Sequence, residues 1–207
     1  MSKEFEYSKK WYEDVYHAEL KNPNYIPDPK NFHPERDIQC LQDLGVKPEH
    51  LILMCGCGGG DDIYLLDKEF DCHNITGIDF SETAINFCNR YFDWVKAYCT
   101  CVSEIPFDDN TFDILCALDV TEHLPIDTYL FFLFEAYRVL KVGGRIAVLP
   151  GQTNRPEHIN ILSLPIIAFH MRKIGFTIPI HKNEWIIGEK VVKERKLVGE
   201  GKNGIVS

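Results

Sequence analysis

Four of the five residues at positions 56–60 are glycine, and this part of the chain is the best suited to hold a ligand. The apolar run 51–55 precedes them, and a helical pattern follows. Glycine permits positive φ and close approach of a ligand to the backbone, and the free N–H groups of a helix N-terminus attract anions. The spacing therefore predicts a strand, a tight turn and a helix, with a ligand on exposed peptide N–H groups. The alternative is a plain turn, for which one or two glycines are enough.

A carboxylate stands where a second ligand contact is expected. Asp79 ends the short apolar run 74–78, about 20 residues after the glycines. At that spacing, an acidic side chain at the tip of the neighbouring strand can reach the hydroxyl groups of a ribose. In the alternative interpretation Asp79 belongs to a helix-entry turn, in which Ser81 caps the helix and Glu82 interacts favourably with the helix dipole.

Apolar periodicity predicts the elements that position these residues. Apolar residues three and four apart indicate helices, and short unbroken apolar runs indicate buried strands. Alternating strands and helices of this length form a parallel sheet covered on both faces, with right-handed crossovers. We therefore predict an α/β, doubly wound, Rossmann-like fold. Its first five strands are expected at 51–55, 74–79, 95–100, 112–118 and 145–149, with helices at 5–20, 34–44 and 127–141 among others, the last stopped by Gly143 and Gly144.

The last part of the chain departs from this alternation. A helix is expected to begin at Ser163 and to end at Gly175, and residues 176–181 and the segment after 184 have the composition of strands. Pro179 has no N–H to give to a neighbouring strand. Its strand should therefore lie at an edge of the sheet.

Size and charge narrow the class of protein. The 207 residues suit a single domain, and 22 Lys and Arg against 31 Asp and Glu give a net charge of −9. An acidic surface repels phosphate backbones, so no nucleic-acid partner is expected, and the basic cluster 190–196 suits a solvated strand face. The sequence has neither the apolar core of a signal peptide nor a membrane-spanning apolar run. We expect a cytoplasmic protein without a membrane partner.

The eight cysteines lie mostly within expected strands and helices, as buried reduced thiols do. The pairs Cys55–Cys57 and Cys99–Cys101 lack the C-x₂₋₄-C spacing of structural zinc sites. In the expected fold a further strand also separates the two strands that carry them. We therefore expect no metal site.

Several motifs in succession resemble those of the class I S-adenosylmethionine-dependent methyltransferases, and in particular the small methyltransferase type 11 group. The order and spacing of these motifs over roughly residues 35 to 150 are far more specific than a single glycine motif. The family resemblance implies a seven-stranded sheet that ends in an antiparallel hairpin, whereas the classical nicotinamide-binding fold continues with parallel strands. The motifs are residues 55–60, 78–81, 104–113, 122–124 and 138–144.

The resemblance implies S-adenosylmethionine as the cofactor. The glycine segment would pass under the methionine and ribose, Asp79 would bind the ribose hydroxyls, and Phe80 would cover one face of the adenine. Residues 101–103 would border the adenine amino edge, and the residues after the fourth strand would lie beneath the sulfonium. The implied cofactor contacts are Gly56, Cys57, Gly58, Gly60, Asp79, Phe80, Cys101, Val102, Ser103, Ala117 and Leu118.

Methyl transfer from a sulfonium needs mainly alignment and exclusion of water, so a general base is optional. His123 is the candidate base, because imidazole titrates near neutral pH; a purely structural histidine is the alternative. The candidate acceptor contacts are Tyr12, Tyr16, Glu122 and His158. The aromatic helix 5–20 would be a lid over the cofactor by the family analogy, or otherwise a cover for the sheet edge.

Two positions depart from the family pattern. Met54 stands where the family usually has an acidic residue, and Cys101 where it usually has an Asp that binds the adenine amino group. Each change removes a charged hydrogen bond of about 1.5–3 kcal/mol. A binding module without turnover is therefore one rival interpretation. An NAD-dependent oxidoreductase is another, although Asp61 stands where the dinucleotide fingerprint requires its third glycine.

The sequence thus predicts one methyltransferase domain over 1–207, acting on a small-molecule acceptor. Within it, 1–34 would form the aromatic helix and a loop, 35–150 the cofactor-binding core, and 151–207 a substrate-side loop, a helix and the edge hairpin.

Overall fold

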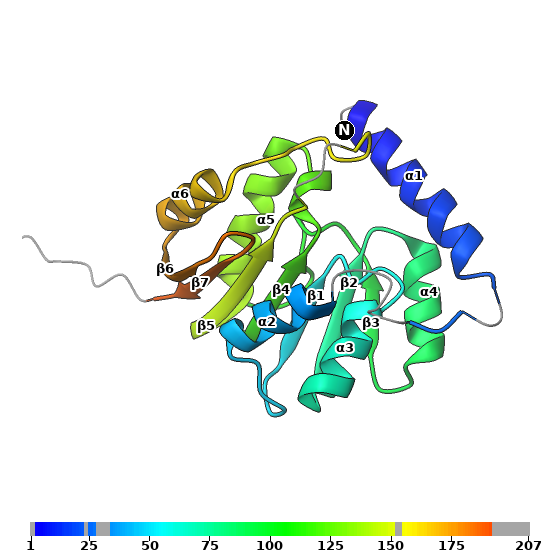
Figure 1. The fold of residues 1–207 in the computed structure, drawn as a ribbon, viewed down its shortest axis with the longest axis horizontal. Helices are drawn as coiled ribbons and strands as arrows, with labels where there is room; N and C mark the ends of the chain where they lie inside the picture. Colours follow the sequence, from blue (N-terminus) through cyan, green and yellow to red (C-terminus); the bar gives the residue numbers. More distant parts are fainter. Residues whose placement is uncertain (1–2, 23–24, 28–33, 152–154, 192–207) are drawn as a thin grey trace, which may run out of the picture.

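The computed structural model describes residues 3–22, 25–27, 34–151 and 155–191. Its centre is a seven-stranded sheet in the order β3-β2-β1-β4-β5-β7-β6 (Figure 1). The first five strands are parallel, and β7 runs antiparallel to both β5 and β6. This confirms the predicted doubly wound sheet and its C-terminal antiparallel hairpin. The strands are β1 (Ile52–Cys55), β2 (Ile75–Asp79), β3 (Lys96–Cys99), β4 (Phe112–Leu118), β5 (Leu140–Leu149), β6 (Phe176–His181) and β7 (Ile186–Lys190).

Helices cover both faces of the sheet. Side chains of α5 and α6 pack on one face, and those of α2, α3 and α4 pack on the other, because successive strand residues point to opposite sides. The helix α1 packs beside α4, away from the centre of the sheet (Figure 1). The described helices are α1 (Lys3–Glu19), α2 (Pro34–Leu44), α3 (Asp61–Phe70), α4 (Glu82–Tyr91), the 3₁₀ turn η2 (Thr121–His123), α5 (Ile126–Val139) and α6 (Leu164–Ile174).

The fifth strand begins earlier than predicted. The helix expected at 127–141 ends at Val139, and β5 already begins at Leu140, which pairs with Phe112 of β4. The register of the β4–β5 pair shifts after that pair, and Gly143 adopts a φ of 81° within the strand. Gly143 and Gly144 therefore lie inside β5 and do not stop a helix. This boundary is set by the pairing of Leu140 with a strand that is distant in sequence. Helical periodicity cannot reveal such a pairing.

The C-terminal hairpin places Pro179 at the edge, as expected. Within the part of the chain that the structure describes, β6 is the outermost strand and pairs only with β7. Its register with β7 shifts between Thr177 and Ile180, so Pro179 sits at a bulge, where its missing N–H costs no regular ladder bond.

One lysine of the predicted solvated face is in fact buried. Lys190 ends β7 with 9% of its surface exposed, and its Nζ donates to the carbonyl oxygens of Leu140 and Arg138 and to Oδ1 of Asn110. These acceptors stabilise the ammonium group in the interior. The remainder of the basic cluster, 192–196, lies outside the described residues.

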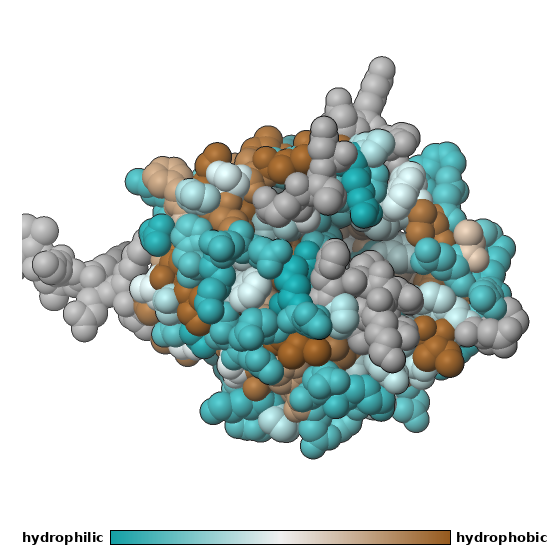
Figure 2. Space-filling model, in the orientation of Figure 1, coloured by the Kyte–Doolittle hydropathy of each residue, from teal (hydrophilic) through white to brown (hydrophobic). Residues whose placement is uncertain are grey.

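Apolar side chains also gather on the surface over α5 and α6 (Figure 2). Phe131, Phe134 and Phe169 each expose more than half of their area. None of the described helices has the length and hydrophobicity that crossing a lipid bilayer requires. Six of the eight cysteines are buried as expected, whereas Cys99 is exposed and Cys101 is half-buried; all eight are free thiols.

Candidate functional site

The segment 55–60 connects β1 to α3 in a tight turn. Gly58 has a φ of 49° and Gly60 a φ of 93°, values that L side chains rarely adopt. A Cβ at Gly58 would lie 2.7 Å from the hydroxyl of Tyr16, and one at Gly60 would lie 2.5 Å from the ring of Phe92. The glycines are therefore required by the backbone conformation and by close packing. We call residues 56–60 the glycine loop.

Asp79 ends β2 beside the glycine loop. Its Oδ2 accepts a hydrogen bond from the N–H of Gly58 and its Oδ1 accepts one from the N–H of Ser81, both at 2.9 Å. Ser81 in turn caps α4, its hydroxyl accepting from the N–H of Ala84. Burial raises the pKa of Asp79 to about 6, although the two N–H groups oppose that rise. Asp79 thus belongs to the helix-entry turn and also lines the cavity, so the two sequence interpretations of it are compatible.

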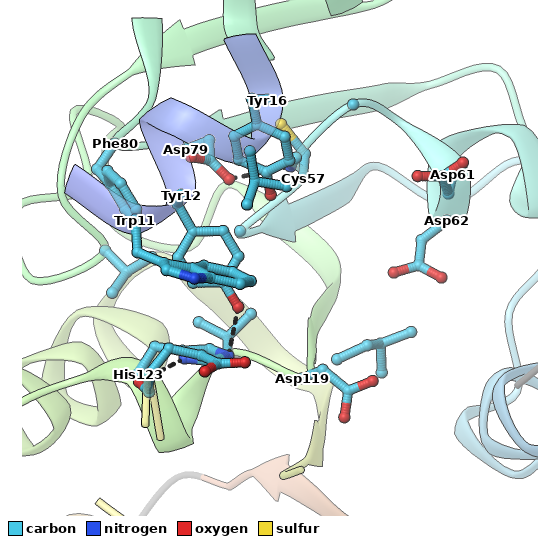
Figure 3. Close-up of a pocket in the computed structure, with 18 of the residues that line it drawn as sticks. Trp11, Tyr12, Tyr16, Cys57, Asp61, Asp62, Asp79, Phe80, Asp119 and His123 are labelled. Atoms are coloured by element: carbon cyan, nitrogen blue, oxygen red, sulfur yellow. Dashed lines mark hydrogen bonds between the residues drawn. The ribbon is translucent and has the colours of Figure 1, made fainter. Parts of the chain in front are cut away.

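Two tyrosines of α1 point toward the glycine loop and β4 (Figure 3). The Tyr16 ring lies against Gly58, and Tyr12 donates a 2.7 Å hydrogen bond to Nε2 of His123. The direction of this bond follows from the other ring nitrogen. Nδ1 of His123 lies 3.0 Å from the carbonyl oxygen of Glu157, which can only accept, so Nδ1 carries the proton. The structure does not describe the side chain of Phe5.

His123 is neutral at physiological pH. Burial lowers its pKa to about 4, and the neighbouring His158 adds to the decrease. Burial also raises the pKa of Tyr12 well above its ordinary value, with Glu122 as the next cause. The pair therefore consists of a neutral phenol that donates and a neutral imidazole that accepts. The imidazole is a weaker base than an exposed histidine.

Glu122 and His158 lie behind His123. Oε1 of Glu122 is 3.6 Å from Nε2 of His123, and the rings of His123 and His158 cross edge to face with centroids 4.7 Å apart. Burial raises the pKa of Glu122 to about 8, with the charge of Asp119 as a second cause. Neither residue lines the cavity.

Carboxylates line the cavity between α2, α3 and the end of β4. Arg36 bridges two of them, with 2.9 Å to Asp37 and 2.6 Å to Asp119. Asp61 and Asp62 face the same space from the first turn of α3, on the right of Figure 3. Burial raises the pKa of Asp62 well above its ordinary range, and the carboxylates of Asp37 and Asp119 are the next causes. This acidic end carries more negative charge than Arg36 neutralises.

These elements enclose a cavity of about 340 Å³. It brings together most of the residues that the sequence predicted. The predicted residues that line it are Tyr12, Tyr16, Gly56, Cys57, Gly58, Asp79, Phe80, Cys101, Val102, Leu118 and His123. Those that do not line it are Gly60, Ser103, Ala117, Glu122 and His158.

The sequence prediction omitted several cavity residues. Trp11 and Val15 lie on α1, a helix that the sequence pattern predicts. Choosing the face of that helix that points to the cavity would have been enough to predict them. Asp37 comes from the helix α2 before the glycines, and Glu157 comes from a segment far after them in sequence. No motif marks them. Only the folded arrangement brings them to the cavity.

Comparisons with known proteins agree with this geometry. Residues 53–148 match the model of a protein family described as a methyltransferase domain. An uncharacterised protein of Methanocaldococcus jannaschii is 34% identical over 131 residues, which cover 61% of this chain and 54% of that protein. The demethylmenaquinone methyltransferase of Staphylococcus aureus MRSA252 is 33% identical over 120 residues, which cover 56% of this chain and 48% of that enzyme. The chain thus spans about half the length of these relatives.

A solved structure supports the fold over almost the whole chain. The geranyl diphosphate C-methyltransferase of Streptomyces coelicolor A3(2), solved with Mg²⁺, geranyl diphosphate and S-adenosyl-L-homocysteine, superposes with a TM-score of 0.69 at 16% identity. The match covers 92% of this chain and 98% of that one. The family match contains the glycine loop, Asp79 and His123, and the sheet ends in the antiparallel hairpin expected of this family. Residues 53–148 thus match a methyltransferase domain family, and the described chain has the fold of a solved methyltransferase.

Proposed function

We propose that the protein binds S-adenosylmethionine in the cavity and transfers its methyl group to a small-molecule acceptor. The observation that carries this proposal is the position of the cavity, which has the glycine loop and Asp79 on one side and His123 with Tyr12 on the other. One wall suits a nucleoside with an amino-acid tail, and the other wall is free to contact an acceptor.

The residues present fit this cofactor. Gly56, Gly58 and Gly59 of the glycine loop line the cavity, so a ligand can lie against bare backbone there, although the N–H groups of Gly56, Cys57, Gly58 and Gly60 already donate within the chain. The Asp79 carboxylate has lone pairs beyond the two that Gly58 and Ser81 use, and these can accept from ribose hydroxyls. Phe80 and Val102 offer apolar surface to an adenine ring.

The acidic end of the cavity offers a reason why Met54 can be tolerated. Met54 is buried in β1 and offers no charge. Asp61, Asp62 and Asp119 line the cavity nearby, and a cationic amino group is stabilised by such an excess of carboxylates. We assign this end to the methionine ammonium group of the cofactor.

When bound, S-adenosylmethionine would supply an activated methyl group for in-line displacement by an acceptor atom, with the C–S electron pair left on sulfur. Asp79 and the glycine loop hold the nucleoside part in place. Tyr12, Tyr16 and Trp11 of α1 line the cavity and would help to shield the bound cofactor from water. His123 receives a hydrogen bond at Nε2, and an acceptor hydroxyl or amine could take the place of the Tyr12 hydroxyl there. A small acceptor is also consistent with the names of the relatives, which include a demethylmenaquinone methyltransferase and a sterol 24-C-methyltransferase.

A binding module without turnover is the second candidate. The Tyr12–His123 hydrogen bond favours it, since it occupies the only lone pair of the candidate base and packs a phenol ring against the imidazole. The oxidoreductase interpretation receives no such support. The antiparallel pairing of β7 with β5 and β6 is the ending expected of the methyltransferases.

Calorimetry and an activity assay separate the candidates. Purified protein is titrated with S-adenosylhomocysteine and separately with NAD, and release of S-adenosylhomocysteine from S-adenosylmethionine is then measured against a panel of quinone, sterol, prenyl diphosphate and amine acceptors. Binding of S-adenosylhomocysteine with turnover on any acceptor supports the enzyme. Binding without turnover supports the module. Binding of NAD alone would contradict both.

A further inference from the structure

Glu122, His123 and His158 form a cluster that methyl transfer itself does not require. One possible ligand atom from each residue lies within 4.8 Å of the other two. Glu122 and His123 come from the 3₁₀ turn after β4, and His158 comes from the segment between β5 and α6. Ligand atoms around a single metal ion lie about 3–4 Å apart, so the three side chains need to move by only about 1 Å to share one.

The Glu122 carboxylate is the strongest sign that a ligand belongs here. Its side chain is 1% exposed, and among the described residues neither of its oxygens has a partner in full hydrogen-bond geometry, although the N–H groups of Glu122 and Gly151 face it. A side chain at position 151 would collide with Oε1, and Gly151 leaves that space open. Burial of a carboxylate without a partner is unfavourable. A cation between Glu122 and the imidazoles would supply the missing partner.

His123 is oriented as a metal ligand. Its Nδ1–H donates to the carbonyl oxygen of Glu157, which fixes the tautomer and leaves the Nε2 lone pair for an ion. Histidines that bind metals usually donate their other ring N–H in this way. In the structure the Tyr12 hydroxyl donates a hydrogen bond to that lone pair. This hydrogen bond would break when Nε2 binds the ion. Tyr12 lies on α1, so its departure would leave the turn that carries Glu122 and His123 in place.

We infer that Glu122, His123 and His158 bind a divalent transition-metal ion, such as Zn²⁺ or Mn²⁺, at the inner wall of the cavity. Two imidazoles and one carboxylate are typical ligands of such ions, whereas Mg²⁺ and Ca²⁺ prefer oxygen alone. Three protein ligands leave at least one coordination position open. Because His123 lines the cavity, that position is available to an oxygen atom of an acceptor. This last role rests on the proposed methyl transfer; binding of the ion does not.

In the sequence, only the cysteine pairs suggest a metal site, and their spacing argues against one. The cluster found in the structure contains none, and its third member is 35 positions after His123 in the sequence. The spacing of Glu122, His123 and His158 matches no short metal motif, so only the fold brings them together.

Metal titration of the full chain tests the inference. Protein treated with a chelator and dialysed is titrated by calorimetry with Zn²⁺, Mn²⁺ and Mg²⁺ in separate experiments. We expect one Zn²⁺ or Mn²⁺ per chain and at least about tenfold weaker binding of Mg²⁺. With Co²⁺ as a probe, visible d–d bands without a near-ultraviolet thiolate band should appear, because the ligands are nitrogen and oxygen.

Variants locate the site. Glu122→Gln and His158→Ala should each weaken binding by about tenfold to a hundredfold. His181→Ala, which removes an exposed imidazole from the end of β6, is the matched control and should bind as the parent does. Circular dichroism checks the fold of each variant, and His158→Ala serves if Glu122→Gln does not fold, because His158 is only half-buried.

Three results would overturn the inference: absence of stoichiometric binding, equal binding by the parent and both variants, or a thiolate band with Co²⁺. Titration of the same samples with S-adenosylhomocysteine distinguishes a failure of the metal-site inference from a failure of the proposed function. Cofactor binding without metal binding refutes only the metal site, and metal binding without cofactor binding refutes only the methyltransferase activity.

Discussion

Asp79 at the tip of β2 and Gly58 in the glycine loop are joined by a 2.9 Å hydrogen bond from the Gly58 N–H to the Asp79 carboxylate. Two segments that contact the proposed cofactor thus hold each other. The bond fixes the loop before any ligand arrives, and a preorganised loop loses less entropy on binding. Changes at either residue should affect both the ligand and the loop.

Asp79→Ala should weaken S-adenosylhomocysteine binding by about 2–4 kcal/mol, because a carboxylate that binds two ribose hydroxyls makes two charge-assisted hydrogen bonds. The change also removes the acceptors for the N–H groups of Gly58 and Ser81, so the midpoint of thermal unfolding should fall. Calorimetry and circular dichroism measure the two effects. An affinity within threefold of the parent in a folded variant would contradict the assignment of Asp79 as the residue that binds the ribose hydroxyls.

Cofactor binding should depend on pH through Asp79. Its pKa of about 6 lies above the ordinary value for Asp, so the carboxylate is ionised at pH 7 and becomes protonated as the pH falls through 6. The protonated form accepts hydroxyl protons poorly, and affinity should therefore fall by about tenfold at pH 5. Titrations between pH 5 and 8 measure this dependence. Asp79→Asn has no such proton to bind, and its affinity should vary much less over the same range; parallel profiles would contradict the role of Asp79.

Gly58→Ala should abolish tight cofactor binding, whereas Gly143→Ala should not. Both residues have positive φ, at 49° and 81°, so both alanines lose stability by about 1–2 kcal/mol from backbone strain. Only the alanine at 58 also meets the Tyr16 hydroxyl, at 2.7 Å, since nothing lies within 4 Å of a Cβ at 143. Denaturant unfolding and calorimetry together separate strain from obstruction. Equal loss of affinity in the two variants would show that the loop geometry is not what binds the cofactor.

Cys101→Asp should strengthen cofactor binding by about 1 kcal/mol, because it restores an acceptor for the adenine amino group. Cys101 lines the cavity and its Sγ accepts from the Ser103 hydroxyl at 3.1 Å, a bond that a carboxylate can keep. Cys99→Asp adds the same charge two residues earlier, at an exposed position that does not line the cavity. Competition binding compares the two variants. Weaker binding by Cys101→Asp would mean that the pocket is adapted to the thiol.

Local patterns were enough to predict most of the fold. The limits of β4 at Phe112 and Leu118 and of β6 at Phe176 and His181 were predicted to the residue. β4 is a largely apolar run that follows turn residues, and β6 lies between Gly175 and the turn residues 182–184, so neighbours in sequence mark these limits. The start of β5 was missed because Leu140 joins the sheet by pairing with Phe112, a contact between distant residues.

The residues of the candidate site also fall into two groups: those that local motifs predict, and those that only contacts between distant residues bring to the site. The glycine loop, Asp79 and His123 lie on short motifs at the ends of strands, where parallel sheets place their ligands, and sequence alone could find them. The Arg36–Asp119 ion pair spans 83 positions, and the Tyr12–His123 bond spans 111. No local pattern encodes such contacts. They become visible only when the sheet brings α1 and α2 to the ends of β1 and β4.

The hairpin of β6 and β7 also decides how the sheet ends. An outer strand normally presents a row of unused N–H and C=O groups, which invites strands of other molecules to add to it. On β6 this row is interrupted by the imino acid Pro179 and by the one-residue bulge between Thr177 and Ile180. Both features disfavour intermolecular β-sheet extension. The outermost described strand is therefore expected to be a poor template for pairing with a strand of another molecule.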